Sequence, residues 1–336
     1  MYPIIISIKS TKLNIVEKKN ISKFNPFGVI LFSRNITSFN QLNLLIKSIK
    51  FLSKETNILI DQEGGMVNRF NSFPEFKFLN NYDYYEIFLK YPSLAKQLVY
   101  LKSFITSFYL ARSGININTV PVLDIPNKNT IKMIKKRTFG SNIAINQTLN
   151  QILINTSIKF GVMPVMKHIP GHGLSNKDSH FHLPVSYASK SILNKQIQLF
   201  KKFHKLPMSM TAHIKYLNWD KENIATFSSK IIKDLIRKKI NFKGLIMTDD
   251  LTMKANIYDI EQSVYLSNIS GIDIILDCSS DWERYEIIIK NFNKTRYFNN
   301  KNEILSKNIN KKHYLKSINI NHYHDLYNEL LNLYGI

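Results

Sequence analysis

The sequence has few of the residues that cross-link a chain or anchor it in a membrane. Its one cysteine, Cys278, excludes an internal disulfide. No hydrophobic run approaches the roughly 20 apolar residues that a membrane span needs, because Lys, Asn or Asp interrupts each run. The first residues, MYPIIISIKSTK, have no basic segment before their short apolar run and no small-residue cleavage site after it. We therefore predict no signal peptide, no transmembrane segment and a cytoplasmic location.

Arginine is also scarce, which bears on the meaning of the large positive charge. The chain has 46 Lys+Arg against 24 Asp+Glu, a formal net charge of +22, and 7 of the 46 cations are arginines. Arginine reads base edges and phosphates better than lysine, and no arginine-rich or aromatic-basic recognition motif occurs. The lysines are scattered beside abundant Asn and Ile, as codon bias in an AT-rich genome produces. We expect no specific nucleic-acid partner; a non-catalytic, polyanion-binding protein remains an alternative.

The composition is that of a globular protein. Of the 336 residues, 44% are hydrophobic and 12% aromatic, which is enough to build a sizeable core and excludes a disordered basic tail. The length allows either two ordinary domains or one (β/α)₈ barrel.

A repeated alternation of strand-like and helix-like segments favours the barrel. Several of the apolar runs (GVILF, NILI, GLIM, IDIIL) are continuous, as in parallel strands covered on both faces. The predicted strands cover 3–8, 28–33, 57–61, 117–123, 162–167, 208–213, 244–248 and 272–277. The predicted helices cover 38–52, 94–113, 143–160, 191–203, 228–239, 260–270 and 282–292, with Ser191 and Ser228 as candidate N-caps.

These segments predict an α/β fold, a single-domain (β/α)₈ TIM barrel. We assign residues 1–292 to the catalytic barrel and residues 293–336, with a last helix near 322–331, to a C-terminal extension that packs on it. In such a barrel the chemistry belongs at the carboxyl ends of the strands.

Charged residues gather where the predicted strands end. The third strand runs into DQEGGMVNRF, which contains Asp61 and Arg69. Arg34 and Arg137 also follow strands, so three of the seven arginines are expected on the active face. This predicts a basic rim with few carboxylates that suits an acidic substrate.

A cluster of histidines follows the fifth strand. The segments KHIPGHG and DSHFHLP place His168, His172, His180 and His182 within fifteen residues. Two interpretations are open: the four histidines bind a metal ion for a metal-dependent hydrolase, or Asp178 and His180 form an acid/base dyad. The spacing alone does not decide between them.

The seventh strand ends in GLIMTDDLTM, which delivers Asp249 to its carboxyl end. A carboxylate there and an acid/base on another loop match the two-group layout of a retaining glycosidase. The neighbouring Asp250 is interpreted as a residue that caps the following turn.

Taken together, the motifs resemble glycoside hydrolase family 3, and within it the bacterial β-N-acetylhexosaminidases of peptidoglycan recycling. The resemblance runs in order from about residue 28 to 277, through GVILFSRN, DQEGGMVNRF, PVLDI, RTFG, KHIPGHG, DSHFHLP, MTAHIKY, ATFS and GLIMTDDLTMKA. It implies a single barrel domain, a retaining mechanism with a covalent glycosyl-enzyme and no metal or other cofactor. The implied substrates are N-acetylglucosaminyl-anhydro-N-acetylmuramyl peptides, and we expect a monomer.

The resemblance also assigns roles to residues. Asp249 takes the position of the nucleophile, and His180 that of the acid/base, supported by Asp178. Five further residues take positions around N-acetylglucosamine in the −1 subsite: Asp61, Arg69, Arg137, Lys167 and His168.

The sequence departs from the family pattern at several positions outside these groups. Family members usually have Arg at Met66, Asp at Leu174 and an acidic residue at Lys136, and Ile224 replaces a common proline before ATFS.

Overall fold

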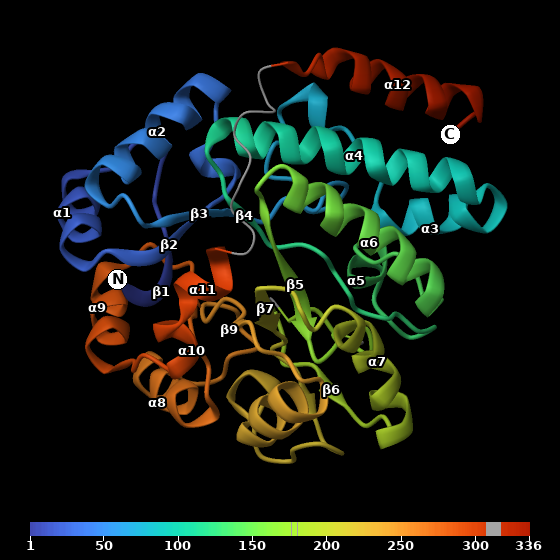
Figure 1. Ribbon diagram of the computed structural model, residues 1–336. Helices are drawn as coiled ribbons and strands as arrows, with labels where there is room; N and C mark the ends of the chain where they lie inside the picture. The colour runs from blue at the N-terminus through green and yellow to red at the C-terminus, as the bar shows by residue number, and fades with distance from the viewer. Residues whose placement is uncertain (176, 180, 307–316) are drawn as a thin grey trace.

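Eight parallel strands form a closed barrel in the computed structural model, which describes residues 1–175, 177–179, 181–306 and 317–336 (Figure 1). The strands are β1 (Tyr2–Ser7), β2 (Pro26–Leu31), β3 (Asn57–Ile60), β4 (Ile117–Asn118), β5 (Met163–Ile169), β7 (Met208–Thr211), β9 (Leu245–Met247) and β10 (Ile275–Asp277). β10 pairs with β1, and an isolated parallel bridge joins Met247 of β9 to Ile274, the residue just before β10. The ring is therefore complete, and the predicted (β/α)₈ fold is confirmed.

The predicted helices form an outer layer around the strands (Figure 1). They are α2 (Phe39–Leu52), α4 (Pro92–Ser113), α6 (Ile143–Lys159), α7 (Lys190–Lys202), the π-helix η4 (Lys230–Lys239), α8 (Ile260–Ser270) and α9 (Trp282–Asn291). Across the described residues, no helix combines the length and apolar character that crossing a bilayer requires.

The two predicted N-caps differ in outcome. Helix α7 is capped by Ser189, whose Oγ accepts the Ile192 N–H at 3.4 Å, so the prediction of Ser191 is wrong by two residues. Ser228 lies just before η4, and its Oγ accepts the Ile231 N–H at 3.1 Å.

Other elements escaped the sequence patterns. The missed helices are α1 (Ile15–Phe24), α3 (Asn81–Lys90), α5 (Lys132–Lys136), α10 (Arg296–Asn299) and α11 (Lys301–Ser306). A short parallel pair, β6 (Val185–Ser186) with β8 (Lys215–Tyr216), was missed as well. Helix α1 has a clear signal, because Asn14 and Glu17 form a reciprocal capping box with two 2.8 Å hydrogen bonds. Its mostly polar sequence has a weak apolar periodicity, so the hydrophobic pattern did not predict a helix there.

The barrel interior is apolar and closed at the amino-terminal ends of the strands. Ile5, Leu59 and Met208 belong to one buried cluster inside the ring. Phe298 of α10 (Arg296–Asn299) joins that cluster and meets Phe27 edge-on, with ring centroids 5.8 Å apart. Helix α11 (Lys301–Ser306) follows α10. A substrate therefore has to enter from the carboxyl ends of the strands.

The last helix, α12 (Ile320–Leu333), lies along α4 on the outside of the barrel (Figure 1). Tyr323 stacks on Phe104 with ring centroids 3.9 Å apart. The buried hydroxyls of Tyr327 and Tyr84 are 2.6 Å apart. The predicted helix near 322–331 is thus present, whereas the proposed boundary at residue 292 stays a prediction.

Two arginines outside the strand ends make ion pairs with fully buried aspartates. Arg237 of η4 pairs with Asp273 and also donates to the Gly244 carbonyl at 2.6 Å. Arg284 of α9 donates to Asp277 Oδ2 from two nitrogens, at 3.1 and 2.7 Å. A guanidinium donates several charge-assisted hydrogen bonds at once, so these pairs fix η4 and α9 to the strands.

Candidate active site

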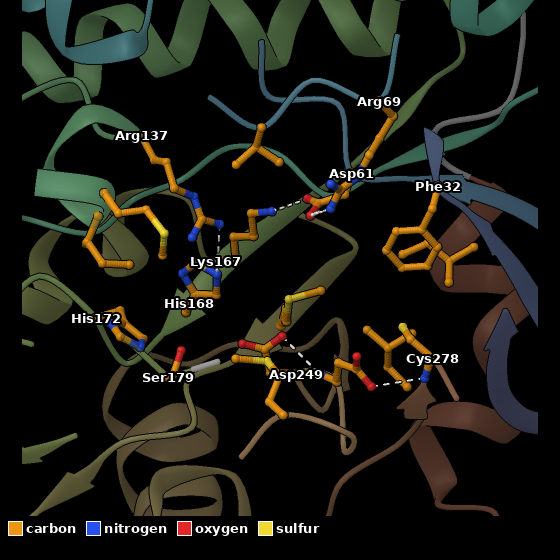
Figure 2. A pocket seen from close by; sticks show the side chains of 18 residues that line it. Phe32, Asp61, Arg69, Arg137, Lys167, His168, His172, Ser179, Asp249 and Cys278 are labelled. Atoms are coloured by element: carbon orange, nitrogen blue, oxygen red, sulfur yellow. Dashed lines mark hydrogen bonds and ion pairs between the residues drawn. The ribbon is translucent and has the colours of Figure 1, made fainter. Parts of the chain in front are cut away.

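A cavity of about 210 Å³ opens at the carboxyl ends of the strands (Figure 2). Its lining contains six of the predicted site residues, namely Asp61, Arg69, Arg137, Lys167, His168 and Asp249. Ser179 lines it as well, while its half-buried neighbour Asp178 is absent from the described lining. His180 lies outside the described residues.

Asp61 follows β3 and accepts hydrogen bonds from three directions. Arg69 Nη2 lies 2.9 Å from its Oδ2, and Lys167 Nζ and Thr119 Oγ1 both donate to its Oδ1. Burial acts to raise the pKa of this carboxyl, but Lys167, Arg69 and Arg137 hold it well below its ordinary value. Asp61 is therefore ionised and oriented toward the cavity.

We call one side of the cavity, which contains Asp61, Arg69, Arg137, Lys167, His168 and His172, the wall. Glu63, which the sequence interpretation did not single out, is ion-paired with Arg137 and Lys167 of this wall. Arg137 donates to the Glu63 carboxylate from two nitrogens, from Nε to Oε2 at 2.9 Å and from Nη2 to Oε1 at 2.7 Å. Lys167 Nζ lies 2.6 Å from Glu63 Oε1. The side chains of Glu63 and Lys167 are each 1% exposed. Against the effect of burial, Arg137 and Lys167 lower the pKa of Glu63.

The prediction of a rim with few carboxylates is therefore wrong. Asp61 and Glu63 neutralise most of the charge of Arg69, Arg137 and Lys167. Arg34 lies outside the lining of the cavity and donates to the Ile8 carbonyl at 3.2 Å. The signal for Glu63 was available, because it stands two residues after Asp61 at the end of a strand.

His168 is held by a second carboxylate that the sequence interpretation missed, Asp124. His168 Nδ1 lies 2.8 Å from Asp124 Oδ2, and the backbone N–H of His172 donates to Asp124 Oδ1 at 2.6 Å. The other ring nitrogen, Nε2, lies 3.4 Å from Nη2 of Arg137, which can only donate. We therefore assign the proton to Nδ1, so that His168 donates to Asp124.

The acid stability of the protein should depend on Asp124. Burial acts to raise the pKa of this carboxyl, but His168 and the His172 N–H bring it down to about 2 from the ordinary 3.8. A carboxyl with a lowered pKa in the folded state stabilises above its unfolded pKa, and this contribution is lost as the pH falls through its folded pKa. We expect the free energy of unfolding to fall between about pH 4 and pH 2.

Urea unfolding of wild type and Asp124→Asn across this range measures the effect. The variant should be less stable at neutral pH and lose less stability on acidification, because it lacks the titrating group. Parallel profiles for the two proteins would contradict the assignment. Asp61 and Glu63 have pKa values shifted in the same direction, so a residual acid dependence is expected in the variant.

Asp249 follows β9 and lies across the cavity from this wall (Figure 2). It is 9% exposed, and its Oδ1 accepts the Asp250 N–H at 2.9 Å. Burial acts to raise its pKa, but His168, His213, the Asp250 N–H and Lys167 outweigh burial, and the pKa lies below the ordinary value. The site therefore holds an ionised carboxylate near neutral pH, as a nucleophile requires.

The turn that carries Asp249 is fixed by its neighbours. Asp250 accepts the N–H of Thr252 at 3.0 Å and the N–H of Cys278 at 3.0 Å, so its interpretation as a turn-capping residue is confirmed. His213, which follows β7, donates from Nε2 to the Asp250 carbonyl at 3.1 Å, and its Nδ1 lies 2.8 Å from Thr226 Oγ1. These contacts restrain the backbone beside the nucleophile candidate.

The described histidines at the end of β5 and in the loop after it do not form a metal-binding group. His168 is paired with Asp124, His172 is buried in the cavity wall, and His182 is exposed. Within the described parts of the chain, no group of three or more His, Cys, Asp or Glu is arranged to hold a metal ion. The four-histidine metal hypothesis also includes His180, outside these parts, and gains no support from the other three.

The loop that carries these histidines is packed tightly against the segment after β4. A Cβ added to Gly173 would lie 2.0 Å from the Ile125 carbonyl oxygen, so only glycine fits there. Thr130 Oγ1 also donates to the Gly173 carbonyl. The four family departures lie outside the described lining: Met66 is exposed, Leu174 packs against the core, Lys136 ends α5, and Ile224 is buried.

Comparisons with known proteins agree with this geometry. The model of the glycosyl hydrolase family 3 N terminal domain matches residues 5–306. A β-hexosaminidase of Psychromonas ingrahamii is 32% identical over 297 residues, covering 83% of each chain. A β-hexosaminidase of Haemophilus ducreyi is 32% identical over 308 residues, which are 89% of this chain and 87% of the relative.

Solved structures extend the similarity to nearly the whole fold. NagZ from Neisseria gonorrhoeae, in complex with N-trifluoroacetyl-D-glucosamine, superposes with a TM-score of 0.86 at 26% identity, covering 98% of each chain. The match over residues 5–306 and the identity to the two curated relatives carry the assignment. The chain therefore belongs to glycoside hydrolase family 3, among its single-domain β-N-acetylhexosaminidases.

Proposed function

We propose that the protein is a retaining exo-β-N-acetylglucosaminidase, with Asp249 as nucleophile and Asp178–His180 as acid/base dyad. The observation that carries the proposal is the buried, ionised Asp249 opposite a hydrogen-bonding wall built from Asp61, Lys167 and their partners. A pyranose between them would present its anomeric carbon to the carboxylate and its hydroxyls to the wall.

The size of the cavity supports action on a chain end. Sites for larger ligands have volumes of roughly 300–1,000 Å³, whereas this cavity has about 210 Å³. The barrel is also closed at its amino-terminal end by Phe298. A closed pocket of this size suits one terminal sugar ring, as expected of an exo-acting enzyme.

The wall residues have complementary roles toward the sugar. Asp61 accepts hydrogen bonds from hydroxyls, while Arg69, Arg137 and Lys167 donate to hydroxyl oxygens as charged groups. His168, with its Nδ1 proton on Asp124, can accept through Nε2. Because the carboxylates already orient these donors, little reorganisation is needed when the sugar binds.

The reaction then has two balanced halves. Asp249 attacks the anomeric carbon while the bond to the leaving oxygen breaks, and His180 gives its proton to that oxygen. In the second half His180 takes a proton from water, the water oxygen attacks the same carbon, and the Asp249 carboxylate is released. An imidazole suits both halves because its ordinary pKa lies near neutrality.

The substrate class we propose is the N-acetylglucosaminyl-anhydro-N-acetylmuramyl peptides of cell-wall recycling. The family resemblance supports it, as does the N-trifluoroacetyl-D-glucosamine named for the Neisseria gonorrhoeae structure. We also propose that the protein is a monomer, and that it is cytoplasmic because the single Cys278 suits a reducing compartment.

Variation of the leaving group tests the activity and the acid/base together. Wild type should hydrolyse both 4-nitrophenyl N-acetyl-β-glucosaminide and the corresponding alkyl glycoside. His180→Ala should slow the alkyl substrate far more, because 4-nitrophenolate leaves without protonation, whereas an alkoxide does not. Initial rates of glycosylation for the two substrates measure the difference.

An unrelated histidine controls for nonspecific damage. His322, exposed on α12, should be replaceable by alanine without effect on either substrate. Equal slowing of both substrates by His180→Ala would remove His180 as the acid, and absence of turnover by wild type would overturn the proposed function itself.

A further inference from the structure

His172 is a buried histidine in the cavity wall that the mechanism above does not use. Its side chain lines the cavity, and the residue is 1% exposed. Neither Nδ1 nor Nε2 has a hydrogen-bond partner in the part of the chain that the structure describes. Its ring meets that of His168 edge-on, with centroids 5.5 Å apart.

The buried His172 ring lacks the hydrogen-bond partners that its two nitrogens require. Burial and the proximity of His168 lower the pKa of His172 to about 4, so the ring is neutral near pH 7. A neutral imidazole has one N–H donor and one acceptor nitrogen. Polar groups inside proteins are nearly always paired, and the neighbouring Asp61, Lys167 and His168 are. Arg69 Nε is the other buried nitrogen of this lining without a described partner. For His172, where both ring nitrogens are unpaired, a partner that arrives with the substrate accounts for the observation.

The order of contacts along the wall indicates which substrate group this is. Asp61 contacts Lys167, Arg137 lies beside His168, and His168 packs against His172, so Asp61 and His172 are at opposite ends. His172 is also close enough to interact electrostatically with Asp249. Figure 2 shows the same arrangement, with His172 on the side away from Asp61.

A pyranose has its substituents in a matching order. If Asp249 faces C1, as in the proposed function on which this inference rests, the neighbouring ring carbon is C2. The wall residue next to both His168 and Asp249 then faces the substituent on C2, and Asp61 faces the C4 and C6 end. In N-acetylglucosamine that C2 substituent is the acetamido group, whose carbonyl oxygen accepts hydrogen bonds.

We propose that His172 donates a hydrogen bond from its ring to the carbonyl oxygen of the 2-acetamido group, and so selects 2-acetamido sugars over 2-hydroxy sugars. A glucoside presents a shorter group at C2 and leaves this donor unpaired. The site then rejects the glucoside because a buried polar group stays unsatisfied in its complex.

Substrate discrimination by His172→Leu tests the proposal. For 4-nitrophenyl N-acetyl-β-glucosaminide, kcat/KM should fall by about tenfold to a hundredfold, since the acetamido carbonyl loses a buried partner. For 4-nitrophenyl β-glucoside the change should be within about twofold. His172→Asn keeps a donor and should recover part of the N-acetyl preference, and His322→Leu is the matched control on the surface.

Thermal melting supplies a readout independent of turnover. His172→Leu should melt no lower than wild type, because the nitrogens it removes have no partner in the described structure. N-acetylglucosamine should raise the melting temperature of wild type more than that of the variant, with glucose affecting both equally. Equal loss of kcat/KM on both substrates, or equal protection by N-acetylglucosamine, would overturn the role of His172. Protection of wild type without any turnover would instead overturn the proposed function.

Discussion

Replacing Asp249 with alanine should lower kcat for a chromogenic N-acetyl-β-glucosaminide by several orders of magnitude, because no other group forms the covalent intermediate. Asp249 is an ionised carboxylate that lies across the cavity from the wall that contains Asp61 and Lys167. The fold should be unaffected, since the variant removes a buried charge and leaves the strands intact. Steady-state kinetics and the melting temperature together measure both outcomes.

Added azide makes this test specific for a nucleophile. In Asp249→Ala the small anion can occupy the space of the lost carboxylate and attack the anomeric carbon from the same face. The product should be a glycosyl azide of inverted configuration, identifiable by NMR. Asp234→Ala, an exposed residue paired with Lys238 on η4, is the control and should match wild type. If Asp249→Ala retained wild-type rates, Asp249 would not be the nucleophile.

Loss of Glu63 should have the largest effect on stability. Glu63→Ala leaves Arg137 and Lys167 buried without their shared carboxylate, and breaking a buried ion pair in this way costs about 3–5 kcal/mol. Activity should fall too, because both cations would turn toward Asp61 and change the hydroxyl-binding surface. Urea unfolding at neutral pH measures the loss of stability.

The chain offers a matched comparison on its surface. Glu286 pairs with Lys290 at 3.5 Å in α9, and their side chains are 39% and 71% exposed. Glu286→Ala should cost less than about 1 kcal/mol, since water replaces the lost partner. Equal destabilisation by Glu63→Ala and Glu286→Ala would mean that the buried network does not hold the wall together.

The barrel and much of its chemistry were predictable from local patterns. Continuous apolar runs marked the buried parallel strands, and the rule that barrel chemistry follows strand ends pointed to Asp61 and Asp249. The prediction for strand 117–123 was too long, because regular pairing ends at Asn118 and a proline follows at 121.

What the sequence could not supply was the pairing between distant residues. Glu63 and Arg137 are 74 positions apart, and Asp124 and His168 are 44 apart, so each pair forms only when the ring closes. We predicted a basic rim because the sequence does not reveal that each cation at the strand ends lies beside a carboxylate in the folded protein. The sequence likewise offered His172 only as a metal-ligand candidate, because it does not reveal that both ring nitrogens lack a hydrogen-bond partner among the described residues.

The arginine pairs outside the cavity have a consequence for how this chain tolerates lysine enrichment. Arg237 donates to Asp273 and to the carbonyls of Phe242 and Gly244, and Arg284 donates from two nitrogens to Asp277, which one ammonium group cannot do in the same geometry. Together with Arg137, which donates twice to Glu63, three of the seven arginines make such multidentate contacts. Codon bias toward lysine can therefore replace arginine only where no planar, multidentate cation is structurally required.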